Sequence, residues 1–413
     1  MDLITIGQNA KAASKSLMDL STADKNQALL HMADVLRTHS DKIIAANAVD
    51  MENARMNGMR EGLLDRLFLD AGRVDGICDG LVHVASLDDP VGKIGAFTSN
   101  KDGLQIARMT VPMGVVAMIY EGRPNVTVDA AGLCLKSGNA VILRGSSSII
   151  NTSRCMVELM RHALEDTGND PDGIQLLENT DHAVVQELIH MNGYVDLAIP
   201  RGGASLIQAV VKNATVPVIE TGTGNCHLFV DSSADIEMAV RILINGKTQR
   251  VGVCNALESI VVTEDIAEAF LSKAAPALAE KHVIIYGCER TRALIQCEAA
   301  TEDDYGREYG DYKISCKVVD DFDQAVSHIN HYSTGHSECI VTNDYSHATL
   351  FLRRIDSACV YVNASTRFSD GGEFGFGAEI GISTQKMHAR GPMGLEALTS
   401  YKYVILGEGQ IRG

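Results

Sequence analysis

The sequence predicts an α/β protein with parallel sheets and more than one domain. Short apolar runs alternate with amphipathic segments of helical length from about residue 104 onward, which is the pattern of parallel strands joined by helices. The 413 residues are 46% hydrophobic and 22% charged, so the chain has apolar mass for more than one core. No stretch approaches the ~20 apolar residues that a membrane-spanning helix needs.

Charge and cysteine content narrow the class of protein. With 36 Lys+Arg against 53 Asp+Glu the net charge is -17, which makes nucleic acid and anionic membranes poor partners. The ten cysteines form no CxxC pair, and the first residues lack the apolar core of a signal peptide. We therefore expect reduced thiols and a cytoplasmic protein. The 13 histidines show no metal-ligand spacing, and no metal is expected.

The first 87 residues are helical in pattern. A helix that carries Leu29, Met32 and Leu36 on one face can be capped by Ser21. Residues 88–92, rich in Asp, Pro and Gly, break the helices. We find no chemistry in this region and expect its polar faces to be solvated.

A strand–helix–strand unit follows. Residues 104–120 alternate and then become β-branched, which predicts a strand or hairpin followed by a buried strand. A turn at 121–125 leads to a helix from Val126 that closes at Ser137-Gly138-Asn139, and AVILRG at 140–145 is a second buried strand. This order is typical of a parallel βαβ unit.

The alternation continues to a glycine pair. A helix at 151–167, a strand in IQLLE, a helix at 183–191 and the strand VDLAIP precede Gly202 and Gly203, which open another helix. Backbone N–H groups and the helix dipole at such a junction can hold an anion. Two adjacent glycines also form a plain tight turn, and the residues alone leave both interpretations open.

Glu220 stands at the end of a further expected strand, VPVIE, just before a glycine-rich turn. A carboxylate there is either a general base or a hydrogen-bond acceptor of the turn. Helix–strand passages follow at 264–285 and 321–342. The chain closes with a glycine-rich segment, a helix and a final strand, and a glycine-rich segment of that length is typical of a functional loop.

Cys254 lies in NGKTQRVGVCNALESIVV, residues 245–262, between a basic approach and an apolar run that predicts a buried strand. Positive charge from Lys247 and Arg250, together with a flexible Gly252 and nearby backbone N–H groups, favours a reactive thiolate. A cysteine that only fills space in a core is the alternative that this stretch alone leaves open.

Several motifs together resemble the aldehyde dehydrogenase superfamily and, within it, the glutamate-5-semialdehyde dehydrogenase (γ-glutamyl phosphate reductase) family. The superfamily pattern is a strand that ends in Glu with a glycine-rich turn, followed by a polar approach to a cysteine. The narrower likeness is carried by DPVGKI, VPMGVVAMIYEGRPNVTVDAAGLCLKSGNAVILRG, IPRGG, KTQRVGVCNALE and HARGPMGLEALTSYKY. It covers essentially the whole chain.

The resemblance implies a role for each matching position. Cys254 matches the nucleophile and Glu220 the base position. Gly202 and Gly203 match the turn beside the dinucleotide, and Glu308 lies about where the superfamily has a glutamate on the nicotinamide ribose. The end of the expected strand at 140–145 and the residue after it, namely Arg144, Gly145 and Ser146, match the segment that meets the adenosine ribose. This part of the chain carries an arginine and hydroxyls with no carboxylate, which favours NADPH over NADH.

The implied reaction is the reduction of L-glutamate 5-phosphate to L-glutamate 5-semialdehyde through a thioester on Cys254. Lys247 and Arg250 are candidates for the substrate phosphate or for lowering the thiol pKa. Arg123, Asn125 and Arg390 are candidates for the amino-acid end. The superfamily's oxyanion asparagine has no clear counterpart, so the backbone N–H of Cys254 is the expected donor. A hydrolytic NAD(P)-dependent aldehyde dehydrogenase and a non-catalytic nucleotide-binding protein of the same fold are the alternatives.

The implied architecture is a Rossmann-like cofactor domain, an α/β catalytic domain and a small oligomerisation hairpin. We expect the NADPH-binding domain at 1–101 and 120–225, the catalytic domain at 226–399, and the hairpin and its partner strand at 102–119 and 400–413. An exposed strand edge needs a cover, so a homodimer or homotetramer is expected. Contact with glutamate 5-kinase, which makes the unstable substrate, is a further expectation that no residue in the sequence identifies.

Overall fold

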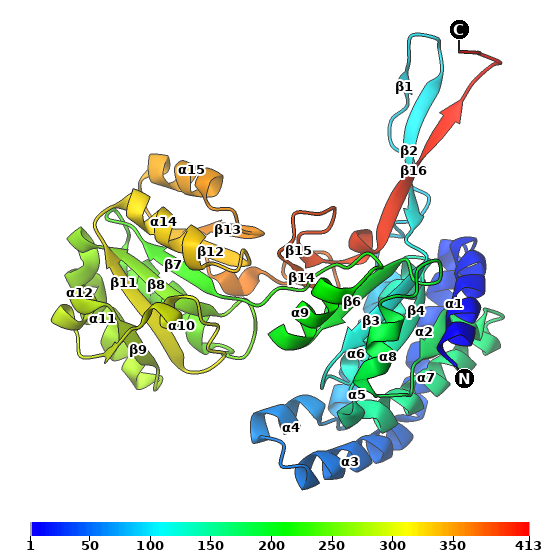
Figure 1. Cartoon of the computed structure of the whole chain (residues 1–413), viewed down its shortest axis with the longest axis horizontal. Coiled ribbons are helices and arrows are strands. Elements are labelled where there is room, and N and C mark those ends of the chain that lie inside the picture. Colours follow the sequence, from blue (N-terminus) through cyan, green and yellow to red (C-terminus); the bar gives the residue numbers. More distant parts are fainter. Residues whose placement is uncertain (1, 413) are drawn as a thin grey trace. The chain divides into compact units, whose positions relative to one another are not determined.

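The computed structural model describes residues 2–412, and these form two compact units (Figure 1). Among the described residues, unit 1 comprises 2–220, 376–381 and 393–412, and unit 2 comprises 221–375 and 382–392. The chain therefore passes more than once between the units. Each unit has its own parallel sheet, as the alternation of apolar runs and helices predicts.

Unit 1 begins with five helices, α1 (Leu3–Met18), α2 (Thr22–Thr38), α3 (Ser40–Met56), α4 (Glu61–Leu67) and α5 (Ala71–Ser86). Ser21 caps α2, because its hydroxyl accepts from the Asp24 N–H while the Asp24 carboxylate accepts in return. Leu29, Met32 and Leu36 are buried, so the helical face expected from the sequence is the packed one.

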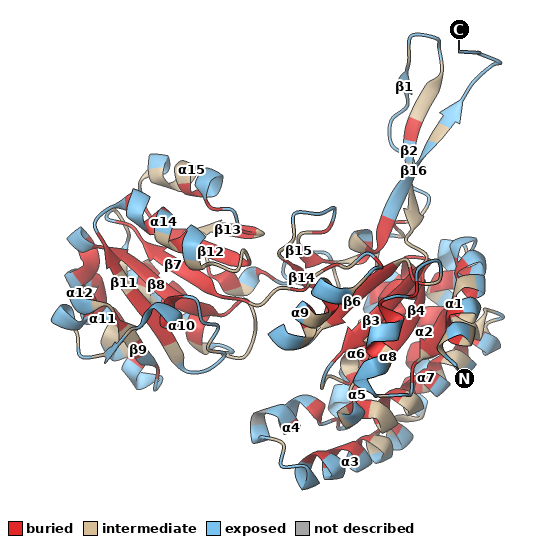
Figure 2. Cartoon of the chain, viewed as in Figure 1, coloured by how far each residue is buried: buried red, intermediate tan, exposed pale blue. Residues whose placement is uncertain are grey.

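The sheet of unit 1 has the strand order β5-β4-β3-β6, and every pair is parallel. Its strands are β3 (Val115–Tyr120), β4 (Ala140–Gly145), β5 (Ile174–Leu176) and β6 (Leu197–Arg201), and its helices are α6 (Asn125–Lys136), α7 (Ile150–Asp166), α8 (His182–Leu188) and α9 (Ala204–Asn213). All residues of β3 and β4 are buried, as Figure 2 shows. The expected βαβ unit is confirmed, and Gly138, at φ +75°, ends α6 where the pattern placed the stop.

Unit 1 also carries a three-stranded antiparallel sheet, β1-β2-β16, formed by β1 (Thr98–Ser99), β2 (Gln105–Pro112) and β16 (Thr399–Leu406). Strand β16 pairs with β2 over its whole length, from Thr399 opposite Pro112 to Leu406 opposite Gln105. The expected domain limits need correction here. Strand β3 belongs to the parallel sheet, so the hairpin ends before residue 115, and residues 376–381 and 393–399 belong to unit 1.

The sheet of unit 2 is parallel with the order β10-β9-β11-β8-β7-β12-β13. Its strands are β7 (Cys226–Val230), β8 (Leu257–Thr263), β9 (Ile284–Gly287), β10 (Glu298–Ala299), β11 (Lys313–Val319), β12 (Ser337–Val341) and β13 (Cys359–Val362). One face packs on α10 (Ile236–Thr248) and α11 (Glu264–Glu280), and the other on α14 (Phe322–Tyr332) and α15 (Tyr345–Arg354). The short helices α12 (Glu289–Leu294) and α13 (Glu302–Tyr305) lie in the connections.

Two expected elements are wrong. VPVIE forms no strand, because only Val218 makes an isolated bridge, to Ala198, and Pro217 has no N–H to extend a ladder. The helix expected before the last strand is a single 3-10 turn at Leu395–Leu398. The glycine-rich stretch before it contains the short strands β14 (Gly381–Ser383) and β15 (Gly391–Met393), which pair with each other. Among residues 2–412, no helix has both the length and the apolarity to cross a membrane.

Candidate active site

Cys254 lies on a turn between the end of α10 and the start of β8, at the amino ends of the strands of unit 2. Its side chain is partly exposed, as are those of Cys155, Cys288 and Cys297, whereas the other six cysteines are buried, at positions 78, 134, 226, 316, 339 and 359. A nucleophile must be reachable by its substrate, and a core-filling thiol need not be. The position therefore favours the reactive-thiol interpretation over the packing alternative.

The segment Gly224 to Cys226 packs against the backbone of this turn. A Cβ at Gly224 would overlap the carbonyl group of Cys254, so only glycine allows the two backbones to approach this closely. The Cys226 thiol donates to the Cys254 carbonyl oxygen at 3.2 Å. Burial raises the pKa of Cys226 well above its usual range, which keeps this sulfur protonated and able to donate.

Glu308 reaches the same place from a distant part of the chain. Its Oε1 accepts from the backbone N–H of Gly224 at 3.0 Å, while its side chain remains exposed. Because Gly224 packs directly on Cys254, this contact brings the Glu308 carboxylate close to the candidate nucleophile. The position that the family resemblance implied for Glu308 thus lies beside Cys254 within one unit.

An arginine that the sequence did not single out completes the surroundings of the turn. The Arg367 guanidinium donates to Asn255 Oδ1 and, at 3.0 Å, to Gln249 Oε1, and Asn255 Nδ2 donates to the Ser369 carbonyl at 3.0 Å. Burial, and then the nearby Arg250, lower the pKa of Arg367 from its usual value. Arg250 itself is exposed. Arg367 lies 112 residues from Asn255 in the sequence, so no local pattern could have revealed it.

Lys247 is the first correction among the expected site residues. Its side chain is 0% exposed, and its ammonium group forms an ion pair of 2.6 Å with Glu258, which is also 0% exposed. Burial lowers the pKa of Lys247 and raises that of Glu258 to about 7. An ammonium group committed in this way is not available to a substrate phosphate. The basic approach to Cys254 is therefore made by Arg250 and Arg367.

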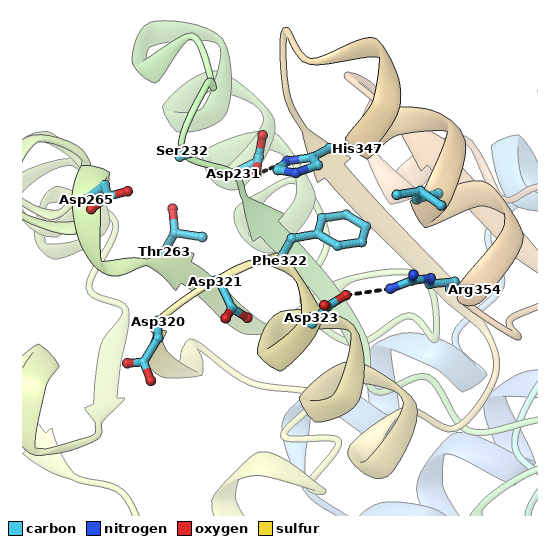
Figure 3. A pocket seen from close by; sticks show the side chains of 11 residues that line it. Asp231, Ser232, Thr263, Asp265, Asp320, Asp321, Phe322, Asp323, His347 and Arg354 are labelled. Atoms are coloured by element: carbon cyan, nitrogen blue, oxygen red, sulfur yellow. Dashed lines mark hydrogen bonds and ion pairs between the residues drawn. The ribbon is translucent and has the colours of Figure 1, made fainter.

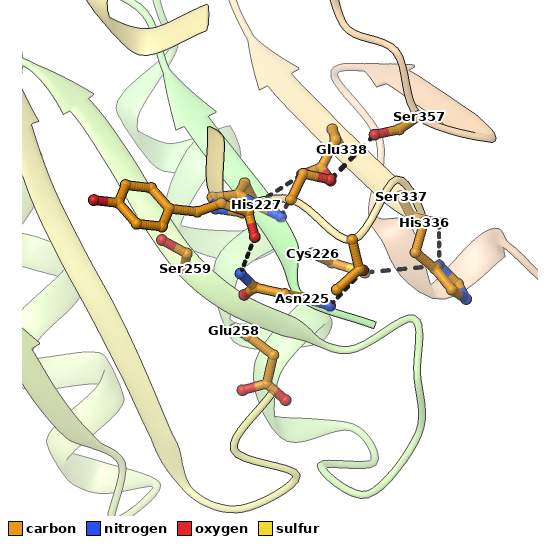
Figure 4. A network of polar contacts seen from close by, with 12 residues as sticks. Asn225, Cys226, His227, Glu258, Ser259, His336, Ser337, Glu338 and Ser357 are labelled. Carbon is orange, nitrogen blue, oxygen red and sulfur yellow. Dashed lines mark hydrogen bonds and ion pairs between the residues drawn. The ribbon is translucent and has the colours of Figure 1, made fainter. Parts of the chain in front are cut away.

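A buried polar network fixes the strands beneath the turn (Figure 4). The Glu338 carboxylate on β12 accepts from the backbone N–H of His227 at 2.7 Å and pairs with His227 Nδ1 at 3.0 Å. Asn225 Nδ2 donates to the carbonyls of Tyr305 and Tyr332, each at 2.8 Å. These contacts hold the start of β7, and with it Gly224 and Cys226, in one place.

The glycine pair of unit 1 already holds an anionic oxygen. The Gly203 N–H at the start of α9 donates to Glu121 Oε2 at 2.9 Å, and a Cβ at Gly202 would lie 2.5 Å from the same oxygen. Only a residue without a side chain allows a carboxylate to lie so close. The turn therefore fits an anion, here the Glu121 side chain, as a helix N-terminus that binds phosphate oxygens does.

Arg144 is the second correction. Its side chain is 4% exposed, and its guanidinium donates to the carbonyls of Thr180 at 2.6 Å and Asp181 at 3.3 Å. It therefore ties the end of β4 to the segment before α8 and is not free to receive a 2'-phosphate. The hydroxyls of Ser146 and Ser148 pair with each other at 2.7 Å, beside the buried Gly145.

The remaining expected residues are distributed over both units. Asn125 donates through its amide to Asp129 at 2.8 Å, and Arg123 is partly exposed two residues earlier. Arg390 donates to the carbonyl and carboxylate of Asp356 at 3.1 and 3.2 Å. Glu220 is partly exposed at the end of the first segment of unit 1. Unit 2 holds Cys254, Glu308, Arg250 and Arg390, and unit 1 holds Glu220, Arg123, Asn125, Gly202 and Gly203.

A cavity of about 390 Å³ lies at the opposite, carboxyl edge of the sheet of unit 2 (Figure 3). It is lined by acidic residues that follow β7 and β11, including Asp231 and Asp320, and by His347 and Arg354, which pair with Asp231 and Asp323. None of the expected site residues lines it. The candidate active site is therefore the turn at the amino edge.

Known proteins share both the sequence and the fold. The Aldehyde dehydrogenase family matches residues 2–284 and 314–404. A "Gamma-glutamyl phosphate reductase" from Lachnospira eligens is 55% identical over 411 residues, covering 98% of each chain. The crystal structure of a "Gamma-glutamyl phosphate reductase" from Thermotoga maritima superposes with a TM-score of 0.98 at 48% identity and covers 100% of both chains. An engineered glycolyl-CoA reductase with bound NADP+, 15% identical, superposes with a TM-score of 0.70 and shares the fold, covering 98% of this chain and 96% of its own.

Proposed function

The chain belongs to the aldehyde dehydrogenase family, and on that basis we propose that it is an oxidoreductase that reduces L-glutamate 5-phosphate to L-glutamate 5-semialdehyde, the second step of proline biosynthesis from glutamate. The relatives named γ-glutamyl phosphate reductase match it over essentially their whole length. The observation in the structure that carries the proposal is Cys254, partly exposed on a turn that Gly224 and Cys226 brace.

In the proposed reaction the Cys254 thiolate attacks the γ-carbonyl carbon of the acyl phosphate. A C–S bond forms, the C–O bond to phosphate breaks, and phosphate leaves with the electron pair. A nicotinamide cofactor, when bound, supplies the hydride that reduces the resulting thioester. The C–S bond then breaks and Cys254 leaves as thiolate, which restores the enzyme and releases the aldehyde.

Phosphate is a good leaving group, so the reductive direction needs little help from a base. Glu220 then shapes the site or tunes the cysteine, and its role as an activator of water, which the superfamily resemblance implies, is reduced. The backbone N–H of Cys254 is the proposed donor to the oxyanion that forms during attack. Glu308 is proposed to contact the nicotinamide ribose, because its carboxylate is held beside Cys254 by Gly224.

The substrate carries a phosphate, an α-carboxylate and an α-ammonium group. Arg250 is the proposed phosphate ligand, and Arg367, which is held beside the same turn, is added to it. Arg123, Asn125 and Arg390 remain the proposed contacts of the amino-acid end. Since Arg390 is paired with Asp356, it would have to exchange that partner for the substrate carboxylate.

We propose NADPH as the cofactor, with its diphosphate at Gly202 and Gly203. The turn supports this because it accommodates the Glu121 carboxylate oxygen, which carries the same kind of charge as a phosphate oxygen. The segment 145–149 contains hydroxyls and no carboxylate, and this favours a ribose that bears a 2'-phosphate. Arg144 is not part of the proposed phosphate site, because its guanidinium donates to the carbonyls of Thr180 and Asp181.

We propose in addition that β16 is covered by a second copy of the chain, in a homodimer or homotetramer. Tyr401, Tyr403, Ile405 and Leu406 on this strand are each more than half exposed, at 51 to 56%. Apolar side chains on an edge strand are usually covered. Light scattering at micromolar protein should give at least a dimer, and a monomer would contradict the proposal. Contact with glutamate 5-kinase remains a proposal, to be tested by co-sedimentation of the two proteins.

The decisive test is the phosphate dependence of the reverse reaction. NADPH formation from the semialdehyde and NADP+ should require phosphate or arsenate, since the thioester must be released to an oxyanion. Rapid oxidation without either would favour the hydrolytic aldehyde dehydrogenase. The variant Cys254→Ala should lose turnover and iodoacetamide labelling at this position while NADP+ binding stays within about twofold, and retained turnover would overturn the role of Cys254.

A further inference from the structure

The loop that carries Cys254 is closed at its base by two buried contacts between α10 and β8. Gly246 and Lys247, near the end of α10, lie against Leu257 and Glu258, the first two residues of β8. A Cβ at Gly246 would lie 2.8 Å from Leu257 Cγ, so the glycine is what lets the strand approach the helix. We call these four residues the loop seam.

A β-bulge creates this arrangement. Strand β7 pairs with β8 at Cys226–Leu257 and next at His227–Ser259, so Glu258 has no partner residue in β7. Leu257 packs with Ile260 and with Leu243 of α10 on one face of the sheet, and Glu258 reaches Lys247 of the same helix. The bulge thus directs two consecutive side chains toward α10, where regular alternation would direct only one.

The second oxygen of Glu258 links the loop seam to the other side of the candidate site. Glu258 Oε1 accepts from the backbone N–H of Gly310 at 3.2 Å. Gly310 lies two residues after Glu308, whose carboxylate accepts from Gly224, and Gly224 packs on the Cys254 carbonyl. The contacts therefore form a closed circuit from Lys247 through Glu258 to the segment of Glu308 and back to Cys254.

Stability alone does not explain a charged pair at this place. Removing two charges from water is energetically unfavourable, and an apolar pair of similar volume is often as stable or more so. We propose that Lys247 and Glu258 are positioning residues, which fix the Cys254 loop and the Glu308 segment relative to each other for the reaction at Cys254. This inference rests on the proposed function, because it assigns to the pair a role in that reaction.

The test replaces the pair without leaving a charge uncompensated. In Lys247→Met/Glu258→Leu both partners become apolar, so the protein should fold. Either single variant would leave one buried charge without its partner. The matched control is Lys25→Met/Asp89→Leu, which removes an ion pair of 3.0 Å between the buried Lys25 of α2 and the partly buried Asp89, in the loop after α5 of unit 1. Each variant is compared with wild type in melting temperature, in kcat and KM, in NADP+ affinity, and in the rate of Cys254 alkylation by iodoacetamide against pH.

The expected result is a double variant that melts within a few degrees of wild type but loses at least tenfold in kcat, since a misplacement of about 1 Å can cost on the order of 100-fold. NADP+ affinity should stay within about twofold, and the pH midpoint of alkylation should rise as the loop loses its fixed geometry. The control should keep its kcat. A folded double variant with kcat and alkylation profile like wild type would overturn the inference, as would equal losses in the control.

The alkylation measurement separates this inference from the proposed function. If wild type shows no phosphate-dependent turnover, the proposed reaction is wrong, and an unchanged alkylation profile in the double variant would independently reject the positioning role. If wild type turns over and the profile is unchanged, only the positioning role is rejected. A double variant that fails to fold would show that the pair is required for folding itself, which also contradicts the inference.

Discussion

Replacing Gly224 by alanine should disable the enzyme with little loss of fold. The new Cβ would lie 2.7 Å from the Cys254 Cα and would overlap the Cys254 carbonyl group. Non-bonded carbons prefer about 3.5 to 4.0 Å, and the Cys254 carbonyl carbon would lie closer still to the new Cβ than the Cys254 Cα does, so the two backbones must separate by more than about 1 Å. Such a shift of a nucleophile costs on the order of 100-fold in rate, which corresponds to about 2.7 kcal/mol of activation free energy.

The assay is phosphate-dependent NADPH formation from the semialdehyde, with kcat and melting temperature measured on the same preparations. Overpacking of this kind typically costs about 1 to 3 kcal/mol of stability, so the variant should remain folded at 25 °C. Gly222→Ala is the matched control, because the three atoms nearest its Cβ would belong to the Thr384 side chain, whereas those nearest a Cβ at Gly224 belong to the backbone. The reasoning is refuted if Gly224→Ala keeps kcat within threefold of wild type, or if Gly222→Ala loses as much.

Three further outcomes are expected. Glu121→Gln should tighten NADP+ binding about two- to fivefold in calorimetry, because it removes a carboxylate that occupies the N-terminus of α9, and weaker binding would refute this. Burial raises the pKa of the Asp129 carboxyl group to about 6, so the folded state binds the carboxyl proton more tightly than the unfolded state does. The stability that this protonation contributes is present below about pH 4 and is lost as pH rises through about 6. Asp129→Asn should accordingly raise the free energy of unfolding by about 1 to 3 kcal/mol at pH 7 and leave it unchanged at pH 4, and a gain at both values would contradict the assignment. In wild type, kcat/KM should be higher with NADPH than with NADH, and the ratio of the two values should be smaller in Ser148→Gly. A wild-type preference for NADH would contradict the proposed cofactor.

Periodicity and turn residues were sufficient to predict the parallel strands β3, β4, β5, β6 and β8, whereas β7 was not predicted. AVILRG is apolar over its whole length because both faces of β4 are buried, and Gly138 stops α6 because it adopts a positive φ. VPVIE has the same apolar character and yet forms no strand, because a proline within it removes a ladder donor. Composition does not reveal which apolar run finds a partner strand.

In the candidate site, too, features that depend on neighbouring residues differ from contacts between residues far apart in the sequence. The turn of Cys254 and the glycine pair before α9 could be located from the sequence, because each depends on residues that lie together in the chain, and their roles remain predictions. Lys247 was assigned wrongly because the distance from a cysteine along the chain does not tell which way a side chain points, and here the bulge at Glu258 provides a buried partner. The contact of Glu121 with Gly203 joins residues 82 positions apart, and that of Arg367 with Asn255 joins residues 112 apart. Such pairs are set by topology and leave no local pattern.

The pairing of β2 with β16 has a consequence for synthesis. Pro112 lies opposite Thr399, so 399 − 112 = 287 residues must be translated before β2 meets the first residue of its partner. At ribosomal rates of about 5 to 20 residues per second, β2 waits for about 15 to 60 s with one edge unpaired. An open edge is a template for pairing between chains, and this interval is when nascent chains on neighbouring ribosomes are most exposed to one another. Aggregation during overexpression should therefore be relieved by a lower rate of translation initiation, which reduces the number of nascent chains that expose β2 at the same time. A variant of the chain that ends before residue 399 should keep this edge of β2 unpaired.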